Sequence, residues 1–319
     1  MSKAVLGIDV GKRKLDVALM FDQKTLVRKF DNSPSGIKLL EGWLTSLHLE
    51  QVHVCLESTG AYGEAVAEFL HGKGHRISVV NPLRVKGYAN SDLQRNKTDR
   101  ADARTIADFC LTKDPEDWHP LPVEIKHLQT LTRRIESLQG MLNSEQNRLE
   151  LAASEVRPSL DRVIQTLEKE IELVRRLIKE HIDNHPGLRQ QSELLQTIPG
   201  IGERTAQILL GELEFAAFPS ARALAAQAGV TPQQFQSGTS VNRTRLSKLG
   251  NGRIRKALYF PAIVAVKCNQ IVKKFASRLS QNGKTPMQVI CASMRKLIHI
   301  AFGVLKNNRP FDPNLASRI

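Results

Sequence analysis

The sequence contains few cysteines, and their spacing fits neither a metal site nor a disulfide framework. The four of them are scattered through 319 residues without a CxxC pair (Cys55, Cys110, Cys268 and Cys291). This distribution favours reduced cysteines buried in hydrophobic cores. An HExxH motif is missing as well, so the histidines do not show the pattern of a zinc metalloprotease.

Long apolar runs are also absent. No stretch approaches the roughly 18 consecutive apolar residues that a membrane-spanning helix needs. The first residues, MSKAVLGIDVG, lack the charged-then-apolar layout of a secretory signal. Hydrophobic residues still make up 41% of the chain, which is enough to bury a core, and the length suits two or three domains. We therefore expect a folded cytoplasmic protein without a membrane partner.

Acidic residues are missing from a long C-terminal stretch. Between Glu214 and Asp312 there is none, while the same span holds 16 Lys and Arg, more than the net charge of +14 of the whole chain. A segment of one sign repels itself and is most stable beside a polyanion. Nucleic acid is the expected partner, because each neutralised phosphate releases counterions. The alternative is a basic surface that serves only solubility.

Residues 1–121 alternate strand and helix patterns, as an α/β domain does. The predicted order is three linked strands (AVLGIDVG, KLDVALMF, TLVRKF), a helix with Ser33 as its N-cap, a strand (QVHVCLES), a helix (AYGEAVAEFLHG) and a strand (HRISVVNP). The first three strands suggest an antiparallel meander. This order is that of an RNase H-like sheet.

Residues 122–187 change to a helical period. Apolar residues recur at spacings of three and four (Ile125, Leu128, Leu131, Ile135, Leu138 and Leu142, then Leu160, Val163, Leu167, Ile171, Val174 and Ile178). With polar residues between them, the pattern predicts two long amphipathic helices, interrupted near Pro158 and ended at His185-Pro186-Gly187. An intramolecular helical hairpin and a dimerising coiled coil fit this pattern equally well.

Residues 188–319 are expected to form a mostly α domain of short helices joined by loops. The segment IPGIGERTAQILL carries Gly200 and Gly202 between two apolar stretches. It is similar to a helix-hairpin-helix, whose glycine turn exposes backbone N–H groups to a phosphate. An ordinary glycine-containing connection between helices is the alternative. The basic stretch that follows favours phosphate contact.

Four carboxylates stand at positions where they could converge. Asp9 and Glu57 each end an apolar strand, and Asp99 and Asp102 share one face at the start of a helix. Acids that meet at one sheet end repel unless a cation joins them, and Mg²⁺ or Mn²⁺ takes oxygen ligands. Two such metals can clamp both oxygens of a reacting phosphodiester.

Each acid also has an ordinary explanation when it is taken singly. Asp9 could be a turn residue, and Asp99 could favour the positive end of a helix dipole. Asp102 could pair with Arg100 or Arg104 on the surface. The order of two strand-end acids followed by an i,i+3 pair favours a metal site over these explanations.

Five segments in this order resemble the DEDD transposases of the insertion sequence 110 family. The first three lie in residues 1–121 (GIDVGKRKLDVAL, LESTGAY and KTDRADA). The fourth is LLQTIPGIGERTAQILLGEL, and the fifth, farther along the chain, combines AAQAGVTPQQFQSGTS with the nearby RLSKLGNGRIRKALYFPA. The resemblance covers nearly the whole chain. It implies a RuvC-like metal site for the four acids and a C-terminal transposase domain.

The resemblance also implies a nucleophilic serine that joins covalently to DNA, and the matching position is Ser237 in FQSGTS. Ser240 lies close enough to be a rival. A free serine is a poor nucleophile, so a metal or a basic neighbour such as Arg243 or Arg245 would have to assist it. The residues that we expect to contact nucleic acid are Gly200, Gly202, Arg243, Arg245, Lys248, Arg253, Arg255 and Lys256.

Family members are similar to recombinases guided by a structured non-coding bridge RNA. Guidance by base pairing fits a basic chain with only 5% aromatic residues. The resemblance implies a dimer or tetramer that holds donor and target DNA, with a transposase activity. A site-specific DNA invertase, a hydrolytic Holliday-junction resolvase and a non-catalytic nucleic-acid scaffold are the alternatives.

Overall fold

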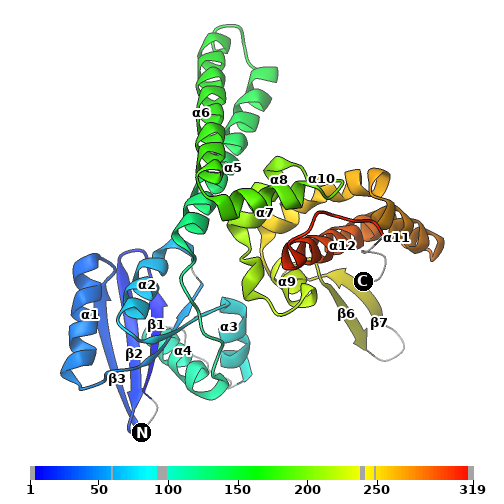
Figure 1. Cartoon of the computed structure of the whole chain (residues 1–319). Coiled ribbons are helices and arrows are strands. Elements are labelled where there is room, and N and C mark those ends of the chain that lie inside the picture. The colour runs from blue at the N-terminus through cyan, green and yellow to red at the C-terminus, as the bar shows by residue number, and fades with distance from the viewer. Residues whose placement is uncertain (1–3, 59, 92–98, 238–240, 248, 315–319) are drawn as a thin grey trace. The chain divides into compact units, whose positions relative to one another are not determined.

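A five-stranded sheet forms the centre of Met1–Pro120, the first of two units into which the chain divides. The second unit, Leu121–Ile319, is largely helical (Figure 1). The computed structural model describes residues 4–58, 60–91, 99–237, 241–247 and 249–314.

The sheet has the strand order β3-β2-β1-β4-β5. Its strands are β1 (Val5–Val10), β2 (Lys14–Phe21), β3 (Lys24–Asp31), β4 (His53–Glu57) and β5 (Arg76–Val80). The first three are antiparallel neighbours, whereas β4 runs parallel to both β1 and β5. The antiparallel meander and the order of strands and helices predicted from the sequence are therefore confirmed.

Both faces of the sheet are covered by helices. These are α1 (Pro34–Ser46), the 3-10 turn η1 (Gly60–Tyr62), α2 (Glu64–Gly72), α3 (Pro82–Ser91) and α4 (Asp99–Lys113). One face packs on α1 and α2, and the opposite face packs on α4. Ser33 caps α1 as predicted, since its hydroxyl accepts a hydrogen bond from the N–H of Gly36 at 3.2 Å.

Two long helices open the second unit, α5 (Val123–Glu150) and α6 (Arg157–Asp183). They pack along each other as an intramolecular hairpin that projects from the remaining helices of the unit (Figure 1). Val163 was predicted to lie on the apolar face of the second helix, but its side chain is exposed, and the neighbouring Ile164 is buried instead. A coiled coil between two copies of the chain stays a prediction.

The rest of the second unit is more regular than short helices joined by loops. Its elements are α7 (Pro186–Gln196), α8 (Glu203–Glu212), η2 (Phe215–Ala217), α9 (Ala221–Gln227), β6 (Pro232–Ser237), β7 (Val241–Leu246), α10 (Gly252–Cys268), α11 (Gln270–Gln281) and α12 (Pro286–Asn307). The antiparallel hairpin β6–β7 was not predicted, because PQQFQS and VNRTRL lack the alternation of apolar and polar residues that indicates a half-buried strand. The expectation of short helices is wrong for α10 and α12, which have 17 and 22 residues.

One helix among the described residues, α12, has the length and composition of a membrane span. Core helices of globular proteins pass the same test. Leu297, Ile298 and Ala301 of α12 are buried, and the helix packs on α9, α10 and α11. Its apolar character is therefore explained by the core of the second unit.

The cysteines are free, and only some of them lie in cores as expected. Cys55 and Cys110 are buried together on the α4 side of the sheet. Cys291 is half-buried, and Cys268 is exposed at the end of α10. The expectation of core burial is therefore wrong for Cys268.

Candidate active site and nucleic-acid interface

Asp9 and Glu57 lie on neighbouring strands at one end of the sheet. In the parallel register of β1 and β4, Ile8 pairs with Leu56, so the next residue on each strand is an acid. Both acids are partly buried. The carboxyl ends of parallel strands thus bring these two residues to the same edge.

The helix α4 lies against the face to which Asp9 belongs. Gly7 precedes Asp9 by two residues and shares its face. A Cβ at Gly7 would collide with the carbonyl oxygen of Ala103 and the amide nitrogen of Ala107. Such an approach of two backbones requires glycine. Asp102, which precedes Ala103, is thereby held near the strand that carries Asp9.

The direction of α4 brings its acidic first turn toward the strand ends. Near the other end of the helix, Cys110 interacts with Cys55 in the middle of β4 and with His53 at its start. The first turn, which begins at Asp99, therefore lies toward the carboxyl end of β4. Asp102 is partly buried, whereas the side chain of Asp99 is outside the described part of the chain.

A side-chain amide ties together the loops that follow the two acids. Nδ2 of Asn32 donates one hydrogen bond to the carbonyl of Gly11, at 2.9 Å, and another to the carbonyl of Tyr62, at 3.0 Å. Gly11 follows β1, and Tyr62 follows β4. Asn32 therefore fixes the spacing of the strand ends at which Asp9 and Glu57 stand.

A fifth carboxylate, absent from the predicted set, lies beside Asp9. Asp16 of β2 is directly opposite Asp9 in the antiparallel register, so the two share a face. The side chain of Asp16 is only 2% exposed, and Nζ of Lys29 and Lys14 lie 3.0 and 3.4 Å from its oxygens. These lysines offset a negative charge that would otherwise repel Asp9. The sequence contains a signal for this pair, because side chains alternate between the two faces along both strands that flank the turn at Gly11.

The donor set at this edge fits a hard divalent cation. Asp9, Glu57 and Asp102 lie on three elements, and carboxylate oxygens suit Mg²⁺ or Mn²⁺ better than a softer metal. Among the side chains that the structure describes, no three histidines, cysteines or acids are grouped as metal ligands. The described side chains of Asp9, Glu57 and Asp102 are therefore not gathered as metal ligands, and the set of four acids stays a prediction.

The predicted nucleophile, Ser237, is the last residue of β6. It pairs with Val241 across the β6–β7 hairpin, while Phe235 pairs with Arg243 and Gln233 with Arg245. Arg245 is exposed on β7, and the side chains of Ser237 and Arg243 are not described. The rival Ser240 and the predicted contact Lys248 lie outside the described residues.

The glycine turn between α7 and α8 combines a packing role with an open helix start. Gly200 has a φ of 105°, and a Cβ there would lie 2.8 Å from Cβ of Ala265 on α10. Gly202 is exposed and begins α8 without a side-chain cap. Both glycines were predicted to contact nucleic acid. Close packing against α10 accounts for Gly200, whereas the backbone at Gly202 is accessible to a phosphate.

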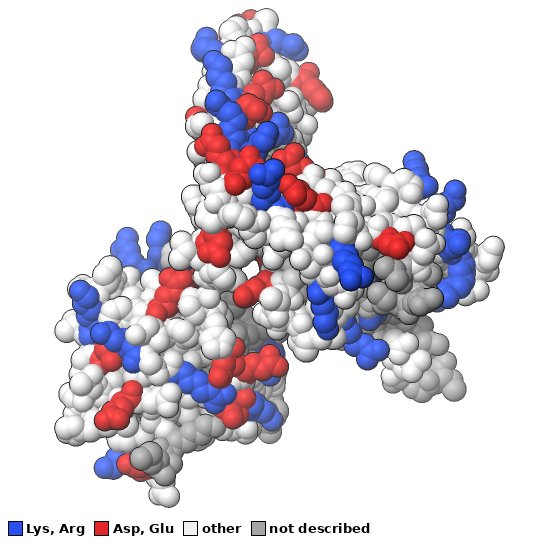
Figure 2. Space-filling model, viewed as in Figure 1, with Lys and Arg blue, Asp and Glu red and all other residues white. Residues whose placement is uncertain are grey.

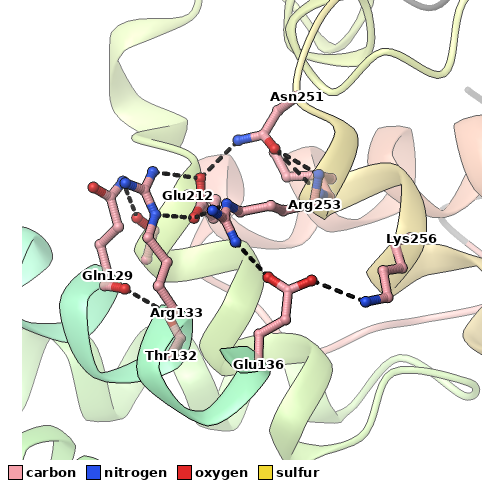
Figure 3. A network of polar contacts seen from close by, with 10 residues as sticks. Gln129, Thr132, Arg133, Glu136, Glu212, Asn251, Arg253 and Lys256 are labelled. Atoms are coloured by element: carbon pink, nitrogen blue, oxygen red, sulfur yellow. Dashed lines mark hydrogen bonds and ion pairs between the residues drawn. The ribbon is translucent and has the colours of Figure 1, made fainter. Parts of the chain in front are cut away.

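Three of the predicted basic contacts are engaged within the protein. Nη1 of Arg253 and Nζ of Lys256 bind the two carboxylate oxygens of Glu136, at 2.5 and 3.0 Å (Figure 3). Nη1 of Arg255 donates to the carbonyl of Gly229 at 3.2 Å and supports the turn after α9. Arg253 and Lys256 remain exposed beside Glu136, whereas Arg255 is half-buried.

A second acid, Glu212 of α8, gathers partners from α5 and α10. Nε and Nη2 of Arg133 donate to its two oxygens at 2.7 and 3.1 Å. Nδ2 of Asn251 donates to Oε2 at 2.7 Å, and Oδ1 of Asn251 caps α10 through the N–H groups of Arg253 and Ile254 (Figure 3). No sequence signal predicts this network, since its members lie far apart in the chain.

Comparison with known proteins relates this arrangement to a family. A model of the DEDD transposases of insertion sequence 110, described as "Transposase", matches residues 6–158, and "Transposase IS116/IS110/IS902 family" matches residues 192–277. The chain is 34% identical over 320 residues to the "Pilin gene-inverting protein" of Moraxella lacunata, covering 99% of each protein. The chain belongs to the IS110 family of transposases.

Other relatives extend this membership over the whole length. The "Transposase for insertion sequence element IS1328" of Yersinia enterocolitica is 26% identical over 341 residues, covering 96% of this chain and 98% of that protein. A "Pilin gene-inverting protein" of Moraxella bovis is 33% identical over 320 residues. As an IS110-family transposase, the chain is an enzyme of DNA recombination. The resemblance predicted from its five sequence segments is confirmed.

The predicted site residues of this IS110-family transposase are divided between the two family matches. All four acids fall within the first match, and Ser237 with the basic positions from Arg243 to Lys256 falls within the second. Figure 2 shows acidic and basic side chains interleaved along the α5–α6 hairpin, whereas basic side chains predominate on the visible face of the helices that follow. The basic side therefore corresponds to the stretch without acids.

Proposed function

We propose that this IS110-family transposase cuts and rejoins DNA through a divalent-metal site of Asp9, Glu57, Asp99 and Asp102 and a covalent intermediate at Ser237. A structured non-coding bridge RNA would select the DNA sites, and the chain would act as a dimer or tetramer. The proposal is supported by the register of β1 and β4, which puts Asp9 and Glu57 at the same edge, and by the packing of α4 against Gly7 on the face of Asp9.

The acids would bind the metal, and the surrounding residues would hold them in place. Mg²⁺ or Mn²⁺ bound by these oxygens would polarise a phosphodiester and stabilise the leaving oxygen. Asn32 spaces the ends of β1 and β4, and Gly7 lets α4 approach β1. Lys29 and Lys14 neutralise Asp16 and leave Asp9 as the acid beside Glu57.

Ser237 would perform the covalent step. Its Oγ attacks phosphorus, the Oγ–P bond forms and the bond from phosphorus to the 3′ oxygen breaks, while the serine proton passes to solvent and the leaving 3′ oxygen takes up a proton from solvent to become a 3′ hydroxyl. A 3′ hydroxyl of the partner strand then attacks the phosphoserine and releases the serine. The pairing of β6 with β7 supports this role, because β7 carries Arg243 and Arg245 alongside the serine strand.

DNA inversion is a second candidate for the biological outcome. The full-length similarity to pilin gene-inverting proteins favours it. Inversion and transposition use the same strand exchange and differ in where the recombination sites lie. A plasmid with the two sites in inverted orientation distinguishes the outcomes, because only inversion restores a closed circle of the same length.

A trapped protein–DNA adduct tests the covalent mechanism. With Mg²⁺ and a nicked site, the wild-type chain should yield a labelled adduct on a denaturing gel, and Ser237→Ala should yield none while it still binds nucleic acid. An unchanged adduct in Ser237→Ala, together with its loss in Ser240→Ala, would transfer the role to Ser240. Cleavage without any adduct would support a hydrolytic junction resolvase.

Recovery of co-purifying RNA tests the guided mechanism. A single structured species should be released from the wild-type chain and be required for strand exchange. Exchange that continues after ribonuclease treatment would contradict RNA guidance and leave a protein-guided invertase.

A further inference from the structure

A pocket of about 400 Å³, lined by both apolar and charged side chains, lies where α5, α8 and α10 meet within the second unit. We call it the α8–α10 pocket, and six of its lining residues define it: Glu136, Arg204, Gln207, Arg253, Lys256 and Phe260. Its volume falls within the range of ligand-binding clefts, about 300–1,000 Å³. Neither the four acids nor Ser237 belongs to it.

Phe260 gives the pocket an exposed aromatic ring. Its side chain is 73% exposed, although phenylalanine is normally buried. The ring of Tyr259 meets it edge-on, with centroids 5.4 Å apart, which restrains its orientation. An exposed ring held in this way is a surface on which a nucleobase can stack.

Cations flank this ring along one face of α10. The exposed residues recur at spacings of three and four (Arg253, Lys256, Phe260, Val264 and Lys267), so they form one stripe. A positively charged track interrupted by an aromatic ring matches a strand whose phosphates and bases alternate. A paired duplex offers no base face to such a ring.

The pocket as a whole is positive. Four cations line it (Arg133, Arg204, Arg253 and Lys256) against two acids (Glu136 and Glu212), which leaves a net charge of 4 − 2 = +2. Burial alone would raise the pKa of Glu136, but hydrogen bonds from Lys256 and Arg253 outweigh it and lower that pKa. Glu136 is therefore an ionised carboxylate that pairs with Arg253 and Lys256, and a phosphate group could pair with the same two cations.

The backbone of α10 adds a hydrogen-bond acceptor at the same place. Pro261 has no N–H, so the carbonyl of Ala257 loses the donor that the helix would normally supply. Both residues line the pocket. Nε2 of Gln207 donates to Oε1 of Glu203 at 3.1 Å, and the amide oxygen of Gln207 can accept a hydrogen bond from the edge of a base.

We propose that the α8–α10 pocket binds one unpaired nucleotide of a DNA or RNA strand, with the base against Phe260 and the phosphate at Arg204 and Lys256. As the strand enters, Arg253 and Lys256 release the carboxylate of Glu136 and bind phosphate instead. The proposal rests on the proposed function, because it assigns a nucleic-acid subsite to the recombinase. It predicts a preference for unpaired over paired nucleic acid at this position.

Fluorescence anisotropy with the full chain tests this subsite. The probes are labelled oligothymidylate, labelled oligouridylate and a fully paired DNA hairpin. Phe260→Ala should weaken binding of a single strand about tenfold, within the range for the loss of one base–aromatic stack, and leave the paired hairpin largely unchanged. Val264→Ala is the matched control, since Val264 is 50% exposed one turn further along the same face and does not line the pocket.

The two single-stranded probes identify the polymer. Weakening with oligouridylate alone assigns the pocket to RNA, and weakening with oligothymidylate alone assigns it to DNA. Lys256→Met should lower the slope of log Kd against log salt by about one phosphate contact. Equal effects of Phe260→Ala and Val264→Ala, or no effect of either, would overturn the proposal. A wild-type chain that binds none of the probes would overturn the proposed function as well, whereas an inert Phe260→Ala in a binding chain refutes the pocket alone.

Discussion

Arg133 of α5 and Glu212 of α8 form a two-point contact, with Nε to Oε1 at 2.7 Å and Nη2 to Oε2 at 3.1 Å. The Glu212 side chain is 3% exposed, so its charge is compensated almost entirely by protein groups. The long α5–α6 hairpin is thereby fastened to the helices that carry the basic face. Buried pairs of this kind are costly to break, because the remaining charge stays buried.

Removal of the Arg133 guanidinium should destabilise the second unit. Arg133→Met is expected to lower the free energy of unfolding by about 2–3 kcal/mol, because the partners left to Glu212 among the described residues are Asn251 and a more distant Arg253. Urea unfolding followed by circular dichroism measures the loss. In the control Arg175→Met, an exposed pair with Glu172 is lost, and stability should hardly change. Equal losses in both variants would contradict a special role of the Arg133–Glu212 contact.

Gly7→Ala should displace α4 from the sheet. The added Cβ meets backbone atoms of Ala103 and Ala107, which cannot rotate away, so a destabilisation of about 3 kcal/mol and loss of DNA cleavage are expected. The matched control is Gly42→Ala in α1, where nothing lies within 4 Å of the new Cβ. That change should stabilise the chain by about 0.5–1 kcal/mol. In thermal unfolding, the Tm should fall in Gly7→Ala and rise in Gly42→Ala.

Asn32→Asp tests whether the strand ends must be held together. A carboxylate has the same shape but cannot donate to the carbonyls of Gly11 and Tyr62. Metal-dependent cleavage should fall about tenfold or more, since small displacements of reacting groups are costly. Thr45→Val removes an exposed hydrogen bond to the carbonyl of Glu41 within α1, and this variant should keep full activity. An Asn32→Asp chain that is folded and fully active would refute the positioning role.

Acidification should weaken the base of the α5–α6 hairpin. His181 packs between His127 and His185, and Nε2 donates to the carbonyl of Glu124 at 2.8 Å. Burial, and then the neighbouring imidazoles, lower the pKa of His181 despite that hydrogen bond. The folded chain therefore binds fewer protons than the unfolded chain at pH values just below about 6.5.

The stabilisation that depends on neutral His181 is complete above about pH 6.5, the pKa of the unfolded chain, and is lost as the pH falls below that value and through the lower pKa of the folded chain. The urea midpoint of the wild-type chain should consequently fall between about pH 7 and 5. His181→Gln keeps a side-chain donor but does not titrate, so its midpoint should fall less steeply. Identical slopes in the two proteins would exclude His181 as a cause.

Local periodicity was sufficient to predict the first sheet and the two long helices. The apolar alternation in β1 and β2 and the Ser33-Pro34 start of α1 depend on neighbours within a few residues. The same local signals indicated that Asp9 and Glu57 end strands. They did not reveal the β6–β7 hairpin, because its exposed polar strands bury no apolar face.

The sequence by itself determined the order of the elements and the acids at strand ends, since both follow from backbone propensity and side-chain alternation. Only the tertiary structure decided which distant residues meet. The strand register sets Asp16 opposite Asp9, and the packing of α5 on α8 and α10 brings Glu136 and Glu212 to their cations. Such contacts join segments separated by many residues, and their free energy depends on burial that no local pattern encodes. The four acids remain the predicted centre of the reaction, and the strand register accounts for Asp9 and Glu57 lying at the same edge of the sheet.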